Sequence, residues 1–494
     1  MKIAGLDIGT TGCKCTVFDE EGTYLGKAYR DYPVKRSVGG HETDISVIMD
    51  GVYEVLGEMA VQYPDIGGVG VTSYGETFVM TDANGTPLHM AMLYTDPRGA
   101  GQCRRLSDQI SEKRIARITG LRPHEMYSIP KMMWIREHQP EIYEAASYIF
   151  MIEDFVVYHL TGMRQIDYSL ASRSMAFDIS KLVWSQEIFD AAGMDTGKMS
   201  RPVPTGTDAG PILPEAASRC GLDPKTRIVS VGHDQIAAAV GAGVFDSSAA
   251  VDGAGTVECI TPIYDGMPDV EVMYDGYFSV VPYVIPGKYA AYAFSYTGGA
   301  LIQWFIETLA GKEAALAAGE GCSVNEYLEK KSVSPTGLLI LPHFAGAATP
   351  YMDTGSRGAI LGLTTDTSAA DLYRGCMEGV VYEMLLNMEA LEGTGCHFAS
   401  LKATGGGARS KEWMQMKADV LNLPITALET ADAGTVGCAM LTGRAIGIFR
   451  DLEDAAAHMV TERETYTPRP DIHERYMQIY PRYQKLYEAV RPLM

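Results

Sequence analysis

The sequence has little positive charge and no cluster of it. Its 494 residues include 41 lysines and arginines and 62 aspartates and glutamates, which gives a formal net charge of −21. A strongly acidic chain without a basic patch is repelled by nucleic acid and by anionic membrane surfaces. We therefore expect no nucleic-acid partner.

Long apolar runs and paired cysteine motifs are also missing. No window of about 18 uncharged apolar residues occurs, and the N-terminus lacks the charged and apolar regions of a signal peptide. The nine cysteines, scattered from Cys13 to Cys438, show no C-x-x-C spacing. These absences predict no membrane association, a cytoplasmic location and reduced thiols.

The composition is otherwise that of a folded globular protein. Hydrophobic residues make up 46% and charged residues 21%, close to the average for such proteins. A chain of this length exceeds one ordinary core, so we expect two large parts.

Residues 2–34 read as three consecutive antiparallel strands, with a hairpin signal at Asp19 to Gly22. Helical spacing follows over 45–63, where Ile48, Val52, Val55 and Met59 share one face, and IGGVGVTSY then reads as a buried strand. This order predicts a mixed sheet covered by helices.

The second half repeats the scheme. SAAVDGAGTVEC again combines an apolar strand, an aspartate (Asp252), a loop of small residues and a return strand, and helices are expected over 299–309 and 369–391. An internal duplication is the economical explanation. We expect an N-terminal domain over 1–243, a C-terminal domain over 244–494 and a cleft between them.

Three loops of small residues could hold phosphate. In KIAGLDIGTTG an apolar strand ends on Asp7 and runs into glycines and threonines, whose amides and hydroxyls suit anionic oxygens. The carboxylate of Asp7 is a hard ligand suited to Mg²⁺. The loop near Gly255 is similar, and ATGGGARS precedes a helix, as phosphate or nucleotide sites do. No Walker A motif, GxxxxGK[ST], is present.

In RIVSVGHDQIAAAVGAG a strand reaches Asp234 and a helix of small residues begins at once. The residues alone leave two interpretations of Asp234. It either caps the helix or acts as a general base at the end of the strand. His233 beside it could tune such a base, although neighbouring strand residues point to opposite faces.

The chain resembles the FGGY carbohydrate kinases over essentially its full length. The resemblance rests on an ordered set of motifs: LDIGTTGCKCTVFD, YSIPKMMWIRE, VGHDQIAAAVGAG, DGAGTVECI, SYTGGALIQWF, LPHFAGAATPYMDTGSRGAILGL and TGGGARSKEWMQMKADVLNLPI. It implies an α/β, two-domain actin/hexokinase-like (ribonuclease H-like) fold with an interdomain catalytic cleft. ATP and Mg²⁺ would be the cofactors.

The resemblance also assigns roles residue by residue. Asp7 would bind Mg²⁺, and Asp234 would take the proton from the attacking hydroxyl. The residues expected to contact the phosphates are Thr10, Thr11, Lys14, Gly255 and Thr256. Those expected around the nucleoside are Gly298, Gly299, Gln303, Gly406, Gly407, Arg409 and Ser410.

The expected acceptor site includes Glu76, because the family places substrate-binding residues there; the alternative is an exposed loop glutamate. Gly75 departs from the arginine of glycerol kinases and the methionine of xylulose kinases, and we expect the missing side chain to leave room for a substrate larger than glycerol. Asp234 and Gln235 would reach the hydroxyls nearest the reacting carbon. Tyr127 lies one position off the substrate tyrosine of glycerol kinases.

Asp96 and Arg98 match family positions near the cleft, with an intradomain ion pair as the equal alternative. The motifs favour a xylulokinase-like kinase that phosphorylates a terminal hydroxyl of a small ketose. Glu76 and Gln235 make a glycerol- or erythritol-type polyol the next candidate substrate, and an L-fuculose-type deoxyketose is a further candidate. An actin-like or chaperone-like ATPase and a catalytically silent sugar sensor are the remote alternatives. The resemblance also allows a homodimer.

Overall fold

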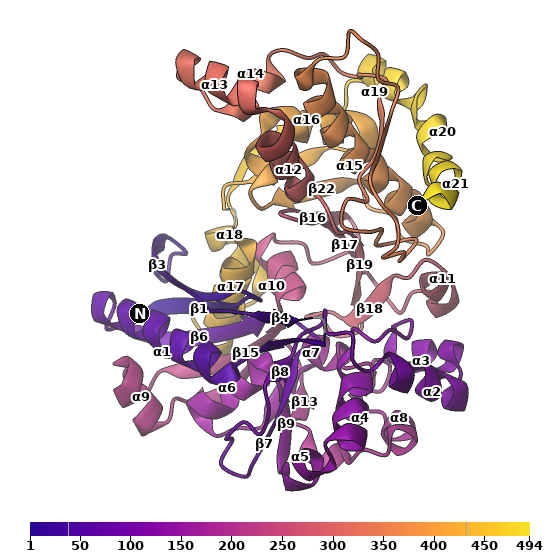
Figure 1. Cartoon of the computed structure of the whole chain (residues 1–494). Helices are drawn as coiled ribbons and strands as arrows, with labels where there is room; N and C mark the ends of the chain where they lie inside the picture. Colours follow the sequence, from indigo (N-terminus) through magenta and orange to yellow (C-terminus); the bar gives the residue numbers. More distant parts are fainter. Residues whose placement is uncertain (38, 431) are drawn as a thin grey trace.

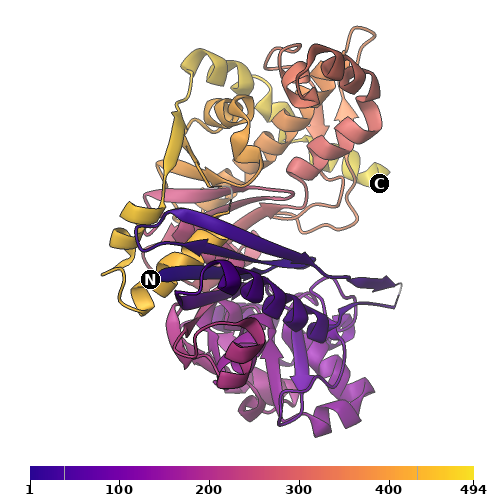
Figure 2. The same cartoon turned by 90° about the vertical axis from the view of Figure 1, so that its left-hand side faces the viewer.

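The computed structural model describes residues 1–37, 39–430 and 432–494. Two large sheets dominate it, one in each half of the chain, and Figures 1 and 2 show the two halves stacked with the termini on different halves. The first sheet has the strand order β14-β15-β6-β1-β2-β3 and the second the order β18-β19-β17-β16-β22-β23-β24.

The strands of the first sheet are β1 (Lys2–Ile8), β2 (Gly12–Phe18), β3 (Tyr24–Asp31), β6 (Ile66–Ser73), β14 (Thr207–Pro211) and β15 (Arg227–His233). Those of the second are β16 (Ala249–Ala254), β17 (Glu258–Tyr264), β18 (Ser279–Pro282), β19 (Tyr289–Ser295), β22 (Ser400–Thr404), β23 (Ile425–Leu428) and β24 (Glu462–Tyr466). A smaller sheet joins β4 (Lys35–Ser37), β5 (Gly40–Thr43), β8 (Ala91–Met92), β7 (Phe78–Thr81) and β9 (Tyr148–Met151). Short two-stranded pairs are β10 (Gln165–Asp167) with β13 (Arg201–Val203), β11 (Phe177–Asp178) with β12 (Val183–Trp184), and β20 (Leu339–Leu341) with β21 (Ala359–Leu361).

The helices of the first half are α1 (Ile45–Gln62), α2 (Ala100–Ile110), α3 (Glu112–Thr119), α4 (Ser128–His138), α5 (Pro140–Ala145), α6 (Ile152–Thr161), α7 (Tyr168–Ser172), α8 (Gln186–Ala192), α9 (Pro214–Cys220) and α10 (Asp234–Gly241). Those of the second are α11 (Val270–Asp275), α12 (Gly299–Leu309), α13 (Gly311–Glu320), α14 (Val324–Glu329), α15 (Ala369–Glu392), α16 (Lys411–Leu421), α17 (Ala433–Ala445), α18 (Leu452–Met459), α19 (Pro470–Met477), α20 (Tyr480–Tyr483) and α21 (Leu486–Val490). The helices expected over 45–63, 299–309 and 369–391 all form.

Both large sheets are built in the same order, as an internal repeat requires. Strands β1, β2 and β3 pair antiparallel in sequence, β6 pairs parallel with β1, and β15 pairs parallel with β6. In the second half β16, β17 and β19 pair antiparallel, β22 pairs parallel with β16, and β23 with β22. Asp7 and Asp252 therefore lie on equivalent central strands.

The buried face of α1 is the one that the spacing predicts. Ile48, Val52, Val55 and Met59 are all buried in the core under the first sheet. Full burial of an aliphatic side chain of this size stabilises the fold by about 1.5 to 3 kcal/mol. These contacts fix the sheet whose strand ends carry Asp7 and Asp234.

Helix α17 joins the two halves in a way that local patterns do not indicate. It belongs to the second half of the sequence, but it packs against α10, β1 and β6 of the first, and Figure 1 shows it beside α10. The crossing with α10 is very close: a Cβ on Gly437 would lie 1.8 Å from the carbonyl oxygen of Ala237. Only glycine fits there.

Candidate active site

The first loop predicted to bind phosphate connects β1 with β2. Asp7 lies next to last on β1, and the loop is closed by a hydrogen bond from the amide of Gly9 to the carbonyl of Gly12. The Nζ atom of Lys14 lies 3.1 Å from Oδ2 of Asp7 and 2.8 Å from Oδ1 of Asp432, at the start of α17. Burial raises the pKa of Asp7, and the ammonium of Lys14 opposes this. Lys14 thus stands between two carboxylates at the loop.

The second loop predicted to bind phosphate, near Gly255, is hydrogen-bonded to the start of α12. The amide of Gly298 donates to the carbonyl of Thr256, and the amide of Gly299 donates to the carbonyl of Gly255, at 3.0 and 2.9 Å. A Cβ on Gly299 would lie 2.8 Å from the carbonyl oxygen of Gly255. The two glycines therefore serve the loop by letting α12 approach it closely.

A buried charge cluster lies beneath this second loop. Lys417 on α16 places Nζ 2.6 Å from Oδ2 of Asp252 and 2.5 Å from Oε1 of Glu258, and none of the three side chains is exposed by more than 1%. Asp252 precedes the loop and Glu258 follows it. One lysine therefore ties both ends of the loop to the helix that follows ATGGGARS.

Six of the seven residues expected around the nucleoside line one cavity of about 590 Å³, and Gly298 does not line it. Its walls include Gly299 and Gln303 of α12 and the whole set Gly406, Gly407, Arg409 and Ser410 before α16. Gln303 also donates to Glu307, one turn further on, at 2.6 Å. Ser410 caps α16 by accepting from the amide of Trp413, and it donates to Glu329 at 3.0 Å. Its hydroxyl is therefore already engaged.

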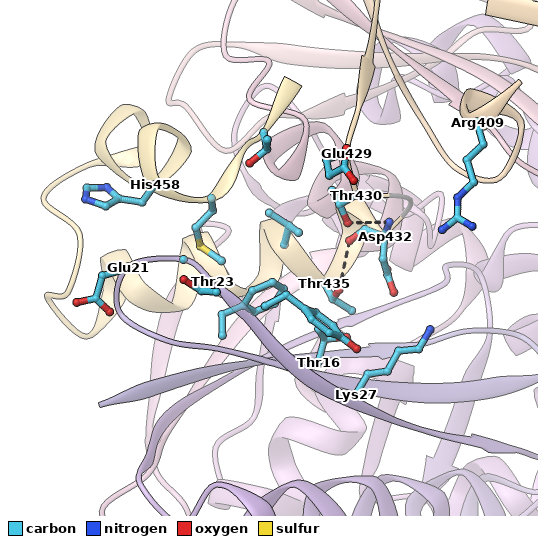
Figure 3. Close-up of a pocket in the computed structure, with 16 residues that line it drawn as sticks. Thr16, Glu21, Thr23, Lys27, Arg409, Glu429, Thr430, Asp432, Thr435 and His458 are labelled. Carbon is cyan, nitrogen blue, oxygen red and sulfur yellow. Dashed lines mark hydrogen bonds between the residues drawn. The ribbon is translucent and has the colours of Figure 1, made fainter. Parts of the chain in front are cut away.

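A second cavity of about 640 Å³ adjoins the first, because Arg409 lines both. It lies between the β2–β3 hairpin, the start of α17 and α18. In Figure 3, Arg409 extends from one wall and Lys27 of β3 from the opposite wall toward the end where Asp432 lies. The dashed lines there mark the amide of Asp432 bonded to Oγ1 of Thr430 and Oγ1 of Thr435 bonded to the carbonyl of Asp432.

Asp234 begins α10 at the end of β15. His233, not Asp234, is the N-cap residue of that helix, so the interpretation of Asp234 as a helix cap is wrong. Burial, together with the charges of Asp7 and Glu76, raises the pKa of Asp234 to about 7, against the amide of Gln235 and the guanidinium of Arg173. A carboxylate with such a pKa is suited to accept a proton near neutral pH.

Glu76 is a buried residue, so the alternative of an exposed loop glutamate is wrong. It is 5% exposed and adopts the left-handed backbone conformation, with φ of 64°. Its Oε1 accepts from Nε of Arg173 at 2.6 Å and lies 2.5 Å from Nη2 of the same guanidinium. The carboxylate of Glu76 therefore forms a buried ion pair with Arg173, and its charge acts on Asp234.

The space beside Gly75 is filled, which corrects the expectation that it leaves room for a larger substrate. A Cβ at this position would lie 2.9 Å from Cγ of Arg173 and 3.2 Å from Cδ2 of His233. The missing side chain therefore admits two neighbouring side chains of the protein. Gly75 shapes the site by that packing.

The remaining candidates for the acceptor site lie in different environments. Tyr127 is buried, with its hydroxyl 3.2 Å from Oγ of Ser279 and its ring 5.3 Å from the guanidinium carbon of Arg173. Asp96 and Arg98 form the intradomain ion pair that was the alternative to a site role, at 2.6 Å. Gln235 lies half-buried in the first turn of α10.

Sequence reasoning missed Arg173, Asp432 and Lys417. Arg173 and Asp432 flank the helices α7 and α17, and Lys417 lies on α16 among other charged residues, so each reads as a solvated side chain. The available signal was their position: Lys417 falls between buried residues of α16, and Asp432 stands before a helix rich in glycine and alanine.

Among the described residues, no group of three or more His, Cys, Asp or Glu side chains is arranged to hold a metal ion. None of the described helices is both long and apolar enough to span a bilayer.

Two large sheets that share the order of their five central strands, each with a loop of glycine and threonine after the central strand β1 or β16, define a protein of the two-domain actin-like ATPase fold. Comparison with known proteins agrees. Residues 2–241 match the N-terminal domain of the FGGY family of carbohydrate kinases, and residues 259–446 match the C-terminal domain. The chain belongs to this family and is a carbohydrate kinase, an ATP-dependent phosphotransferase with an alcohol group as acceptor.

The similar proteins are kinases named for different substrates. A xylulose kinase of Bacillus subtilis is 25% identical over 99% of this chain and 97% of its own, and an autoinducer-2 kinase of Escherichia coli is 27% identical over 98% and 94%. The crystal structure of ligand-bound xylulose kinase from Lactobacillus acidophilus superimposes with a TM-score of 0.90 at 22% identity, covering 99% of this chain and 98% of that one.

Proposed function

We propose that the protein transfers the γ-phosphoryl group of ATP to a terminal hydroxyl of a small ketose, in the manner of a xylulose kinase. The observation that carries this proposal is Asp234, a carboxyl with a pKa of about 7 at the end of β15, in the electrostatic field of Asp7 and Glu76. Full-length similarity to a xylulose kinase supports the ketose. A small polyol is the second candidate, because Glu76 and Gln235 match glycerol-kinase residues.

In this proposal the nucleoside occupies the cavity lined by Gln303, Arg409 and Ser410, and Thr10, Thr11, Gly255 and Thr256 contact the phosphates. Asp7 would hold Mg²⁺, directly or through water. The donor set fits, since Mg²⁺ in phosphate-transferring sites is commonly bound by one or two carboxylates, phosphate oxygens and water. Such an ion would neutralise charge on the phosphates. Lys14, now between Asp7 and Asp432, would lie within reach of the same oxygens.

The acceptor lies between Glu76 and Asp234. The carboxylate of Glu76 accepts hydrogen bonds from substrate hydroxyls, and such charge-assisted bonds are roughly twice as strong as neutral ones. Asp234 accepts the proton of the attacking hydroxyl as the hydroxyl oxygen bonds to the γ-phosphorus and the bond between that phosphorus and ADP breaks. Phosphoryl transfer depends mainly on positioning and charge neutralisation, and the general base adds about 10²- to 10⁴-fold.

The test is a coupled ADP-release assay with Mg·ATP against pentuloses, hexuloses, deoxyketoses and three- to five-carbon polyols, beside a reaction without sugar. The proposal expects strong stimulation by one small ketose. Stimulation by a polyol alone would replace the ketose, and equal turnover in every reaction would instead indicate an ATPase. Asp234→Asn is expected to retain ATP binding and to lose at least about a hundredfold in transfer.

A further inference from the structure

A short chain of side chains leads from the second sheet to Asp234. The hydroxyl of Tyr292, on β19, lies 3.1 Å from Nδ1 of His233. On the other side of the imidazole, Nε2 lies 3.4 Å from Oδ1 of Asp234. Both Tyr292 and His233 are buried, at 4% and 6% exposed. The two ring nitrogens of His233 thus face two different partners.

The turn between β15 and α10 explains why His233 and Asp234 lie together. His233 is the last residue of β15 and Asp234 the first of α10, so strand alternation does not extend across the pair. The expectation that adjacent residues point apart is therefore wrong here. Oγ of Ser169 accepts from the amide of His233 at 3.1 Å, and the hydroxyl of Thr72 donates to the carbonyl of Gly232 at 2.7 Å. These bonds fix the turn.

The imidazole of His233 is neutral, and its tautomer follows from its partners. Burial lowers the pKa of His233 well below the usual value, and the guanidinium of Arg173 lowers it further. A neutral imidazole donates from one nitrogen and accepts at the other. The carboxylate of Asp234 can only accept, so Nε2 carries the proton, and Nδ1 accepts from the hydroxyl of Tyr292.

We propose that His233 and Tyr292 are positioning residues, with Tyr292 fixing the imidazole so that its Nε2–H orients the carboxylate of Asp234 toward the acceptor hydroxyl. This inference rests on the proposed function. The present separation of 3.4 Å is longer than a hydrogen bond of this kind in a finished complex, and such contacts commonly shorten when substrate binds. Because Tyr292 belongs to the second sheet and Asp234 follows β15 of the first, the relative placement of the two halves determines the orientation of the base.

The charges around Asp234 predict the direction of the effect on pH dependence. The groups whose charges act on its carboxylate are Asp7 and Glu76, which favour protonation, and Arg173, which opposes it. A donated hydrogen bond from His233 stabilises the ionised form. Removing the donor should therefore raise the pKa of Asp234, so that Asp234 becomes an active base only at higher pH.

The first experiment compares Tyr292→Phe, His233→Leu and His233→Gln with the wild type on its best acceptor. Tyr292→Phe is expected to lower kcat about fivefold and His233→Leu about tenfold or more, as the loss of one neutral and one charge-assisted hydrogen bond implies. KM for ATP should not change, and the ascending limb of the pH profile should move to higher pH. His233→Gln, whose amide can donate, should recover part of the rate.

Tyr289→Phe is the matched control. Tyr289 lies on the same strand, and its hydroxyl also bridges to the first half by donating to the carbonyl of Ile179 at 3.2 Å. Its removal is expected to leave kcat and the pH profile unchanged. Equal losses in Tyr289→Phe and Tyr292→Phe would overturn the inference, because they would show a general weakening between the halves.

A second measurement does not need the acceptor. In ¹⁵N-histidine-labelled protein, with His233→Gln used to assign the signal, His233 should be neutral with the proton on Nε2 at pH 8, where the carboxyl of Asp234 is ionised. A proton on Nδ1, or an imidazolium, at this pH would overturn the inference. Failure of the proposed function looks different: the wild type then shows no acceptor-stimulated ADP release. That outcome removes both proposals, whereas an active wild type with unaltered variants removes only this one.

Discussion

The ammonium of Lys417 lies 2.6 Å from Oδ2 of Asp252, and neither side chain is exposed at all. Glu258 completes the cluster from the other end of the loop, with its Oε1 2.5 Å from the same nitrogen. Oδ1 of Asp252 and Oε2 of Glu258 have no hydrogen-bond partner among the described residues. The lysine is therefore the one cation that compensates two buried carboxylates in this cluster.

Lys417→Met should accordingly destabilise the protein strongly. Removing one partner of a buried ion pair leaves an uncompensated charge and costs about 3 to 5 kcal/mol. Denaturant unfolding measures this loss. Lys411→Met is the control, because Lys411 lies on the same helix with its side chain 74% exposed and pairs with Glu464 at the surface. Equal stability of the two variants would show that the buried cluster is dispensable.

The rate of transfer should depend on one deprotonation near pH 7. Burial raises the pKa of Asp234 to about 7, and only the ionised carboxylate accepts a proton. We expect kcat/KM for the acceptor to rise with pH and to level off above about 7. Initial rates between pH 5.5 and 8.5 at constant free Mg²⁺ measure the profile. A flat profile in the wild type would contradict the role of Asp234 as the base.

The same carboxyl should cost stability at high pH. Its pKa in the folded protein lies above the unfolded value of 3.8, so the folded state favours the proton. The resulting stabilisation is fully present below pH 4 and is lost as pH rises toward about 7. The free energy of unfolding of Asp234→Asn, taken relative to that of the wild type, should therefore be greater at pH 8 than at pH 5. Because 32% of the side chain is exposed, we expect this difference to be about 1 to 2 kcal/mol rather than the ~3 kcal/mol that ionisation between pH 5 and about 7 implies. Thermal unfolding of both proteins at the two pH values measures the difference.

The sequence predicts the elements and the repeat well because both depend on local patterns. The face of α1, the hairpin at Asp19 to Gly22 and the glycine loops are each encoded within a few residues. Contacts between distant side chains are not: Arg173 and Glu76 are 97 residues apart, and Lys417 and Asp252 are 165 apart. Such pairs depend on how whole elements pack. For the same reason Gly75 reads as empty space, whereas its neighbour in the fold, Arg173, fills it.

Gly75→Ala tests that packing. The added methyl group would meet Cβ and Cγ of Arg173 and the ring of His233 at 2.9 to 3.2 Å. Overpacking of this kind costs about 1 to 3 kcal/mol, and here the strain falls on the two side chains that hold Glu76 and Asp234. We expect a higher KM for the acceptor and an unchanged KM for ATP. A variant whose KM for ATP alone increases would place Gly75 outside the acceptor site.

Gly299→Ala should act on the opposite substrate. Its Cβ would lie 2.8 Å from the carbonyl oxygen of Gly255, so the second phosphate loop must move away from α12 and lose the hydrogen bond that the amide of Gly299 donates to it. Gly311→Ala is the matched control, since it adds the same methyl group in the first turn of α13, where no atom lies within 4 Å. Nucleotide titration followed by tryptophan fluorescence should show ATP bound at least about fivefold more weakly by Gly299→Ala, as expected for one lost hydrogen bond, and normally by Gly311→Ala. Unchanged affinity in both variants would mean that the loop near Gly255 does not contact the nucleotide.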